Sequence, residues 1–197
     1  MSRKLSIIFV CVLCLVGGRV MADNLITNGG LDTDFTGWWT YVPVPADQSI
    51  TIDNANYYSG TGSAKLNCLN SSDDWQKLGQ DFGASALTTY TLSFEYDPEQ
   101  WAQAGVNIQF MDSSWGYLNY VWISLLNPGS TGNTTGWQTY TGTFTTVSGT
   151  AYAEVAFVEG GYGAMNVDDV SVSLVPEPAT MVLLGLGGLL SLRRKHA

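Results

Sequence analysis

Apolar and polar residues alternate along several short stretches of the chain, and no long stretch keeps the period of a helix. In residues 90–96 (YTLSFEY) every second residue is aromatic or leucine, and residues 106–110 (VNIQF) follow the same two-residue period. This alternation is typical of strands that turn one face to a core. It predicts nine strands, over residues 49–52, 63–69, 75–82, 90–96, 106–110, 117–125, 137–145, 151–158 and 165–174.

Glycine, asparagine, aspartate, serine and proline gather between these stretches, as in DNANYYSGTGS and LNPGSTGNTTG. Such clusters mark turns and loops. Many short strands joined by turns favour an all-β fold, and a β-sandwich of two antiparallel sheets is the arrangement that buries their apolar faces.

The N-terminal segment has the pattern of a signal peptide. Two basic residues precede an apolar run over residues 5–16, and a Val-Met-Ala sequence follows where signal peptidase would cut. We expect the mature chain to begin at Asp23. A lipoprotein signal is the alternative, but Cys11 and Cys14 lie inside the apolar run and not at its end.

The C-terminal segment predicts a short apolar helix. The apolar run over residues 179–192 has 14 residues, whereas a membrane-spanning helix needs about 20. Arg193, Arg194 and Lys195 follow it and favour the cytoplasmic side. We therefore expect transient insertion in the inner membrane; the alternative is an ordinary single-span anchor.

The order of Pro176, Glu177 and Pro178, the apolar run and the basic cluster resembles the PEP-CTERM sorting tail of Gram-negative bacteria. The resemblance covers residues 176–197. It implies recognition by an exosortase, cleavage near Pro178, and release to the cell surface or to an extracellular exopolysaccharide matrix.

Between the two terminal segments, residues 23–175 form a length suited to one domain. They hold sixteen acidic residues and only Lys65 and Lys77, a net charge of about −14, so nucleic acid is excluded as a partner. They contain no histidine and no arginine, which excludes Ser-His-Asp catalysis and the usual zinc sites. We expect the protein not to be an enzyme, although a glycosidase that uses two carboxylates stays open as a minor alternative.

Three stretches of this domain, residues 24–38, 58–66 and 166–172, resemble in order the family 4/9 type of carbohydrate-binding module. Residues 137–144 also fit the pattern. The resemblance covers nearly all of residues 24–174 and implies a jelly-roll β-sandwich of the galactose-binding-like fold.

The same resemblance implies a structural calcium ion held by Asp32 and by Asp168 or Asp169. Alternation places the two neighbouring aspartates on opposite faces, and Asp169 is the expected ligand because it would share an inward face with Val167. The family commonly carries a glutamate where this chain has Asp32, so a solvated pair of carboxylates is the alternative.

For ligand binding, the resemblance implies aromatic platforms beside amide and carboxylate side chains. Sugar rings stack their C–H faces on aromatic rings, and their hydroxyls both donate and accept hydrogen bonds. Trp38, Trp75 and Trp137 are expected in the core, and core packing is the alternative for the candidate platforms as well. The candidate ligand-binding residues are Trp101, Trp115, Tyr120, Trp122, Glu95, Asn107 and Gln109.

These patterns together predict an exported surface or matrix protein that binds polysaccharide and is processed by signal peptidase and an exosortase. A structural or interaction protein of the biofilm matrix with no sugar site is the alternative.

Overall fold

The computed structural model describes residues 23–70, 75–98, 103–125 and 136–175. Every regular element within these ranges is a β-strand. The ten strands are β1 (Trp39–Tyr41), β2 (Gln48–Asp53), β3 (Ser63–Cys68), β4 (Gln76–Gly83), β5 (Thr89–Pro98), β6 (Gln103–Met111), β7 (Tyr117–Ser124), β8 (Gln138–Thr145), β9 (Tyr152–Gly160) and β10 (Gly163–Leu174).

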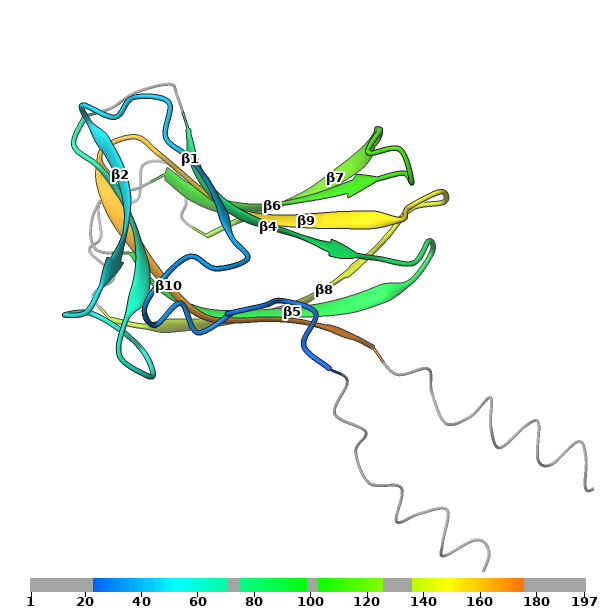
Figure 1. Ribbon diagram of the computed structural model, residues 1–197, viewed down its shortest axis with the longest axis horizontal. Coiled ribbons are helices and arrows are strands. Elements are labelled where there is room, and N and C mark those ends of the chain that lie inside the picture. Colours follow the sequence, from blue (N-terminus) through cyan, green and yellow to red (C-terminus); the bar gives the residue numbers. More distant parts are fainter. Residues whose placement is uncertain (1–22, 71–74, 99–102, 126–135, 176–197) are drawn as a thin grey trace, which may run out of the picture.

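The strands form two antiparallel five-stranded sheets, in the orders β1-β4-β9-β6-β7 and β2-β3-β10-β5-β8. The two sheets lie face to face, and β10 is a long curved strand of the sheet β2-β3-β10-β5-β8 (Figure 1). The predicted all-β sandwich is confirmed, with all nine predicted strands present. The sequence pattern missed β1, which has only three residues.

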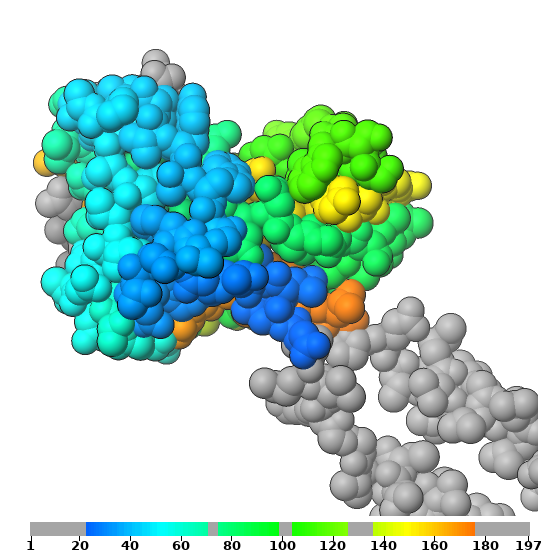
Figure 2. Space-filling view, viewed as in Figure 1, coloured from blue at the N-terminus to red at the C-terminus, as the bar shows by residue number. Residues whose placement is uncertain are grey.

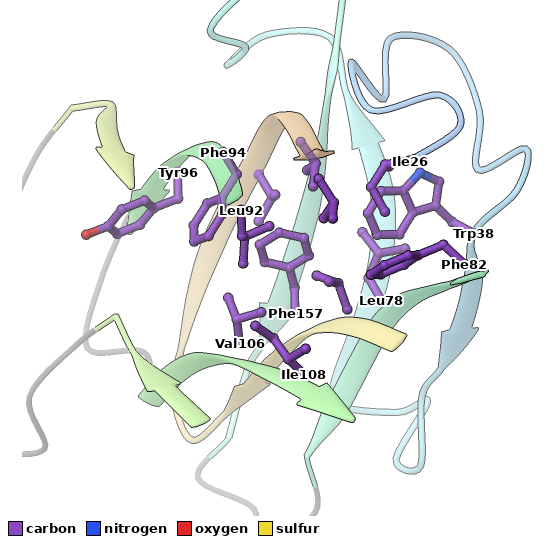
Figure 3. Packing of buried hydrophobic residues seen from close by; sticks show 14 of the residues in the cluster. Ile26, Trp38, Leu78, Phe82, Leu92, Phe94, Tyr96, Val106, Ile108 and Phe157 are labelled. Carbon is purple, nitrogen blue, oxygen red and sulfur yellow. The ribbon is translucent and has the colours of Figure 1, made fainter. Parts of the chain in front are cut away.

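The core lies between the two sheets and follows the predicted alternation. Phe94 on β5 stacks on Tyr140 with ring centroids 4.9 Å apart and meets Phe157 on β9 edge-on at 5.0 Å. Phe94 and Phe157 belong to one buried cluster that draws on both sheets (Figure 3), and the partly buried Tyr140 packs against it. Burying a side chain of this size contributes about 1.5–3 kcal/mol, so the aromatic pairs across the core are a main source of stability.

Both ends of the described domain leave it at one place (Figure 1). The backbone N–H of Leu25 donates to the carbonyl of Val172 at 2.8 Å, which joins the opening segment to the last strand. The Asn24 side-chain oxygen accepts from the N–H groups of Ile26 and Val172. The predicted signal peptide, residues 1–22, and the predicted sorting tail, residues 176–197, lie outside the described residues. Among the residues described, no helix has the length and apolarity needed to cross a membrane.

Candidate functional site

One surface of the sheet β1-β4-β9-β6-β7 points away from the core and is called here the outer face. Residues paired directly in an antiparallel sheet project to the same side. Asn107 on β6 pairs with Trp122 on β7, and Gln109 pairs with Tyr120. The register therefore gathers one set of side chains on this face: Trp39, Tyr41, Lys77, Asp81, Asn107, Gln109, Tyr120, Trp122, Tyr152 and Glu154.

The rings of two tryptophans on the outer face lie directly over glycines of the neighbouring strands. A Cβ on Gly79 would come within 2.3 Å of the Trp39 ring, and a Cβ on Gly105 would come within 2.3 Å of the Trp122 ring. Any larger residue at either position would displace the indole. The two glycines thus fix where the two rings can lie.

The two indoles flank strand β9 from opposite sides. Gly79 is on β4 and Gly105 on β6, and both strands are neighbours of β9. Strands are spaced about 4.8 Å apart, so the two glycines are separated by about 10 Å across the strands. A hollow separates the blue-to-cyan part of the surface, which contains β1, from the green part, which contains β7 (Figure 2).

Further aromatic side chains extend the outer face. Trp122 is 44% exposed and Tyr120 54% exposed. Trp75 meets Trp122 edge-on at 6.1 Å. At the far end, Trp115 stacks on Tyr152 with centroids 4.2 Å apart and planes 5° from parallel. These exposed rings make the outer face a candidate binding surface.

Two carboxylates lie side by side between the aromatic groups. Asp81 on β4 pairs directly with Glu154 on β9, and Glu154 pairs on its other side with Gln109. Burial raises the pKa of Glu154 to about 7; the charge of Asp81 adds to the rise and Lys77 opposes it. Partial burial also raises the pKa of Asp81. Glu154 is therefore partly protonated near neutral pH and can both donate and accept hydrogen bonds.

Asn107 adds an amide to this row of polar groups. Its Oδ1 atom is buried and has no hydrogen-bond partner among the described residues. A buried acceptor without a partner costs about 1–3 kcal/mol. Such a cost is tolerated where a ligand or water satisfies the group.

The structure brings together five of the seven predicted ligand-binding residues. Tyr120, Trp122, Asn107 and Gln109 share the outer face, and Trp115 covers its end. Glu95 lies on β5 of the other sheet, where it accepts hydrogen bonds from the Thr139 hydroxyl at 2.9 and 3.0 Å. Trp101 lies outside the described residues.

The sequence interpretation missed several residues of the outer face, among them Trp39, Asp81 and Glu154. Trp39 belongs to the three-residue strand β1, whose pairing with β4 is tertiary information. Asp81 and Glu154 could have been found, because they take the outward positions of strands that the alternation predicted. Of the tryptophans expected in the core, Trp38 is buried, whereas Trp75 and Trp137 are only partly buried.

The predicted calcium ligands Asp32 and Asp169 lie near each other. A Cβ on Gly30 would be 3.2 Å from Asp32 Oδ2 and 4.0 Å from Asp169 Oδ1. Asp32 Oδ1 occupies the position that a Cβ of Gly60 would take, and it accepts from the N–H of Thr61 at 2.5 Å. Asp169 Oδ1 accepts from the Ser59 hydroxyl. No group of three potential metal-binding side chains of the Asp, Glu, His and Cys types exists within the described ranges.

The prediction that Asp169 shares an inward face with Val167 is wrong. Strand β10 has a bulge between Asp168 and Ser171, and Asp169 has a left-handed backbone with φ 49°. The bulge breaks the alternation, so Asp169 is exposed and Asp168 is fully buried. Burial raises the pKa of Asp168. The backbone N–H groups of Ser59, Asp169 and Tyr58 donate hydrogen bonds to its carboxylate and oppose this rise.

Several solved structures share the fold of this chain but have little sequence identity with it. The enzymatically active domain of tailspike protein 4 from bacteriophage CBA120 is 16% identical with a TM-score of 0.64; the match covers 77% of this chain and 21% of that one. A family 61 carbohydrate-binding module, solved with β-1,4-galactotriose, is 18% identical with a TM-score of 0.52, over 78% and 100% of the two chains. The xylan-binding domain CBM22-1 of Paenibacillus barcinonensis is 12% identical with a TM-score of 0.56, over 80% and 97%.

No curated protein sequence matches this chain. The profile of the PEP-CTERM protein-sorting motif matches residues 174–195. That motif indicates export and a location at the cell surface or outside the cell. The chain thus joins a PEP-CTERM sorting motif to a jelly-roll domain with the fold of carbohydrate-binding modules.

Proposed function

We propose that this protein is an exported, non-catalytic glycan-binding module that associates with exopolysaccharide at the cell surface or in the extracellular matrix. One observation carries the proposal: the rings of Trp39 and Trp122 lie over glycines on the outer face, with hydrogen-bonding side chains between them. Flat exposed indoles are the surfaces on which the C–H faces of sugar rings stack.

The polar row of the outer face supplies the orienting contacts. Asp81 and ionised Glu154 accept hydrogen bonds from sugar hydroxyls, and the amides of Asn107 and Gln109 both donate and accept. The two indoles lie on either side of β9 and are offset by two residues along the strands. A bound chain would therefore run obliquely across the strands, with sugars on both platforms. Because each sugar makes few contacts, we expect weak binding, with dissociation constants in the micromolar to millimolar range. A polymer that offers many binding sites would raise the overall affinity.

The proposal is tested by titrating the domain with a panel of polysaccharides while tryptophan fluorescence and heat are recorded. We expect Trp39→Ala and Trp122→Ala each to weaken binding by about tenfold, since a lost aromatic stack costs about 0.5–1.5 kcal/mol plus the apolar contact. Tyr58→Ala is the matched control, because Tyr58 is an exposed aromatic residue that packs on Trp137 away from the outer face.

The same panel separates this role from its alternatives. If no polysaccharide changes fluorescence or heat, the glycan-binding proposal is wrong and a structural matrix role takes its place. The pair Asp81 and Glu154 is the one arrangement on the outer face that favours hydrolysis, because two carboxylates with different pKa values can act as acid and nucleophile. If the protein released reducing ends from a polysaccharide and Glu154→Gln abolished this release, the non-catalytic proposal would be wrong and the protein would be a glycosidase.

We also propose a structural calcium ion between Asp32 and Asp169. Calcium takes six to eight oxygen ligands, and two carboxylates with the neighbouring hydroxyls and carbonyls supply that chemistry. The ion would join the opening segment to the β2–β3 loop and the bulge of β10. We expect added calcium to raise the melting temperature and a chelator to lower it, with both effects lost in Asp32→Asn. If the melting temperature of Asp32→Asn responded to calcium and chelator as that of the wild type does, calcium would not bind at this site.

A further inference from the structure

The paired carboxylates of Asp81 and Glu154 have no hydrogen-bond donor among the described residues. Like charges directly opposite each other weaken an antiparallel pair. The pair therefore bears an electrostatic cost, which Lys77 on β4 and partial protonation of Glu154 relieve only in part. A ligand that brings positive charge to the pair would relieve it.

The positive charge available near this pair is small. Residues 23–175 contain two lysines, and Lys65 pairs with Asp53 on the other sheet at 3.6 Å. Lys77 shares β4 and the outer face with Asp81, and its charge lowers the pKa of Glu154 less than burial and Asp81 raise it. The outer face thus keeps a net negative potential, inside a domain that carries about −14 overall.

The position of the pair relates it to the aromatic platforms. Asp81 lies two residues beyond Gly79 on the same face of β4, and Glu154 lies two residues from Ala156 on β9. Two residues along a strand span about 7 Å. A sugar stacked against Trp39 would therefore lie about 7 Å along the strands from the two carboxylates. Gln109 borders the pair from β6.

We propose that the outer face selects glycans that carry protonated amino groups over the same glycans with hydroxyl, N-acetyl or carboxylate groups. This inference rests on the proposed glycan-binding function. An ammonium group donates three hydrogen bonds and places one positive charge beside the opposed carboxylates. These charge-assisted hydrogen bonds are stronger than hydrogen bonds from a neutral hydroxyl. An N-acetyl group brings no charge and more bulk, and a uronate adds a further negative charge.

Three β-1,4-linked hexamers test the inference because they differ only at C2: those of glucosamine, N-acetylglucosamine and glucose. Their affinities are compared by calorimetry near neutral pH at low and high salt. We expect the glucosamine hexamer to bind at least about tenfold more tightly than the other two, a difference of about 1.4 kcal/mol. Added salt should narrow this difference, because it screens exposed charges.

Asp81→Asn and Glu154→Gln should each bring the ratio of the glucosamine to the glucose affinity close to one. Glu95→Gln removes the same charge from the other sheet and should leave the ratio unchanged, and melting temperatures verify that each variant folds. Equal affinities for the three hexamers, or a preference for the acetylated one, would overturn the inference. So would binding of other polysaccharides without binding of the glucosamine hexamer, and that result would leave the proposed function intact. If no glycan bound, both the inference and the proposed function would be wrong.

Discussion

Glu159 shows how much a single buried carboxylate can cost this domain. It lies in β9 with no exposed surface and accepts a hydrogen bond from the Gln76 amide. Gln76 Oε1 and Glu159 Oε1 are also buried and have no hydrogen-bond partner among the described residues. Burial raises the pKa of Glu159 from 4.5 to about 8, opposed by the bond from Gln76. The folded protein therefore keeps a proton that the unfolded chain releases.

The raised pKa makes the free energy of unfolding depend on pH. Between pH 4.5 and 8 the unfolded state binds fewer protons at this site, so stability is full below that window and falls as pH rises through it. The slope from this residue is at most about 1.4 kcal/mol per pH unit. We expect urea denaturation at a series of pH values to give a shallower decline for Glu159→Gln than for the wild type. Equal declines would show that Glu159 is ionised in the folded state.

The strands illustrate which features a sequence pattern can predict. The alternation in residues 90–96 and 106–110 correctly placed Phe94 and Ile108 in the core and Asn107 and Gln109 on the opposite surface. Such positions follow from the two-residue period alone. The short strand β1 and the bulge at Asp169 could not be predicted, because the first depends on pairing with β4 and the second inserts a residue without changing composition.

Strand β4 offers a direct test of the platforms, because it carries two glycines on the outer face. The three atoms nearest to a Cβ on Gly79 would all belong to the Trp39 ring, whereas a Cβ on Gly83 would meet nothing within 4 Å. We expect Gly79→Ala to tilt the indole and weaken glycan binding by up to about tenfold, the value of one aromatic stack. Gly83→Ala is the matched control and should bind as the wild type does. Calorimetry measures both, and equal affinities would argue against Trp39 as a platform.

The molecule as a whole separates its folded domain from its sorting motif. Strand β10 ends at Leu174, and the N–H of Val175 donates the last described backbone bond, to the carbonyl of Thr89. The sorting motif matches residues 174–195, so it begins where the sheet ends. The opening segment pairs with β10 beside this point, so both ends of the described domain lie together just before Pro176.

Removal of the tail should therefore leave the sandwich and its outer face unchanged. We expect protein extracted from the cell surface to begin at Asp23 and to end near Pro178, because the apolar run that follows is shorter than a permanent membrane span. Intact-mass measurement determines both ends in one spectrum, and the melting temperature of the processed protein should equal that of residues 23–197 produced without export. A surface protein whose mass still includes Arg193, Arg194 and Lys195 would mean that the tail anchors the domain. The outer face would then bind glycans close to a membrane and not throughout a matrix.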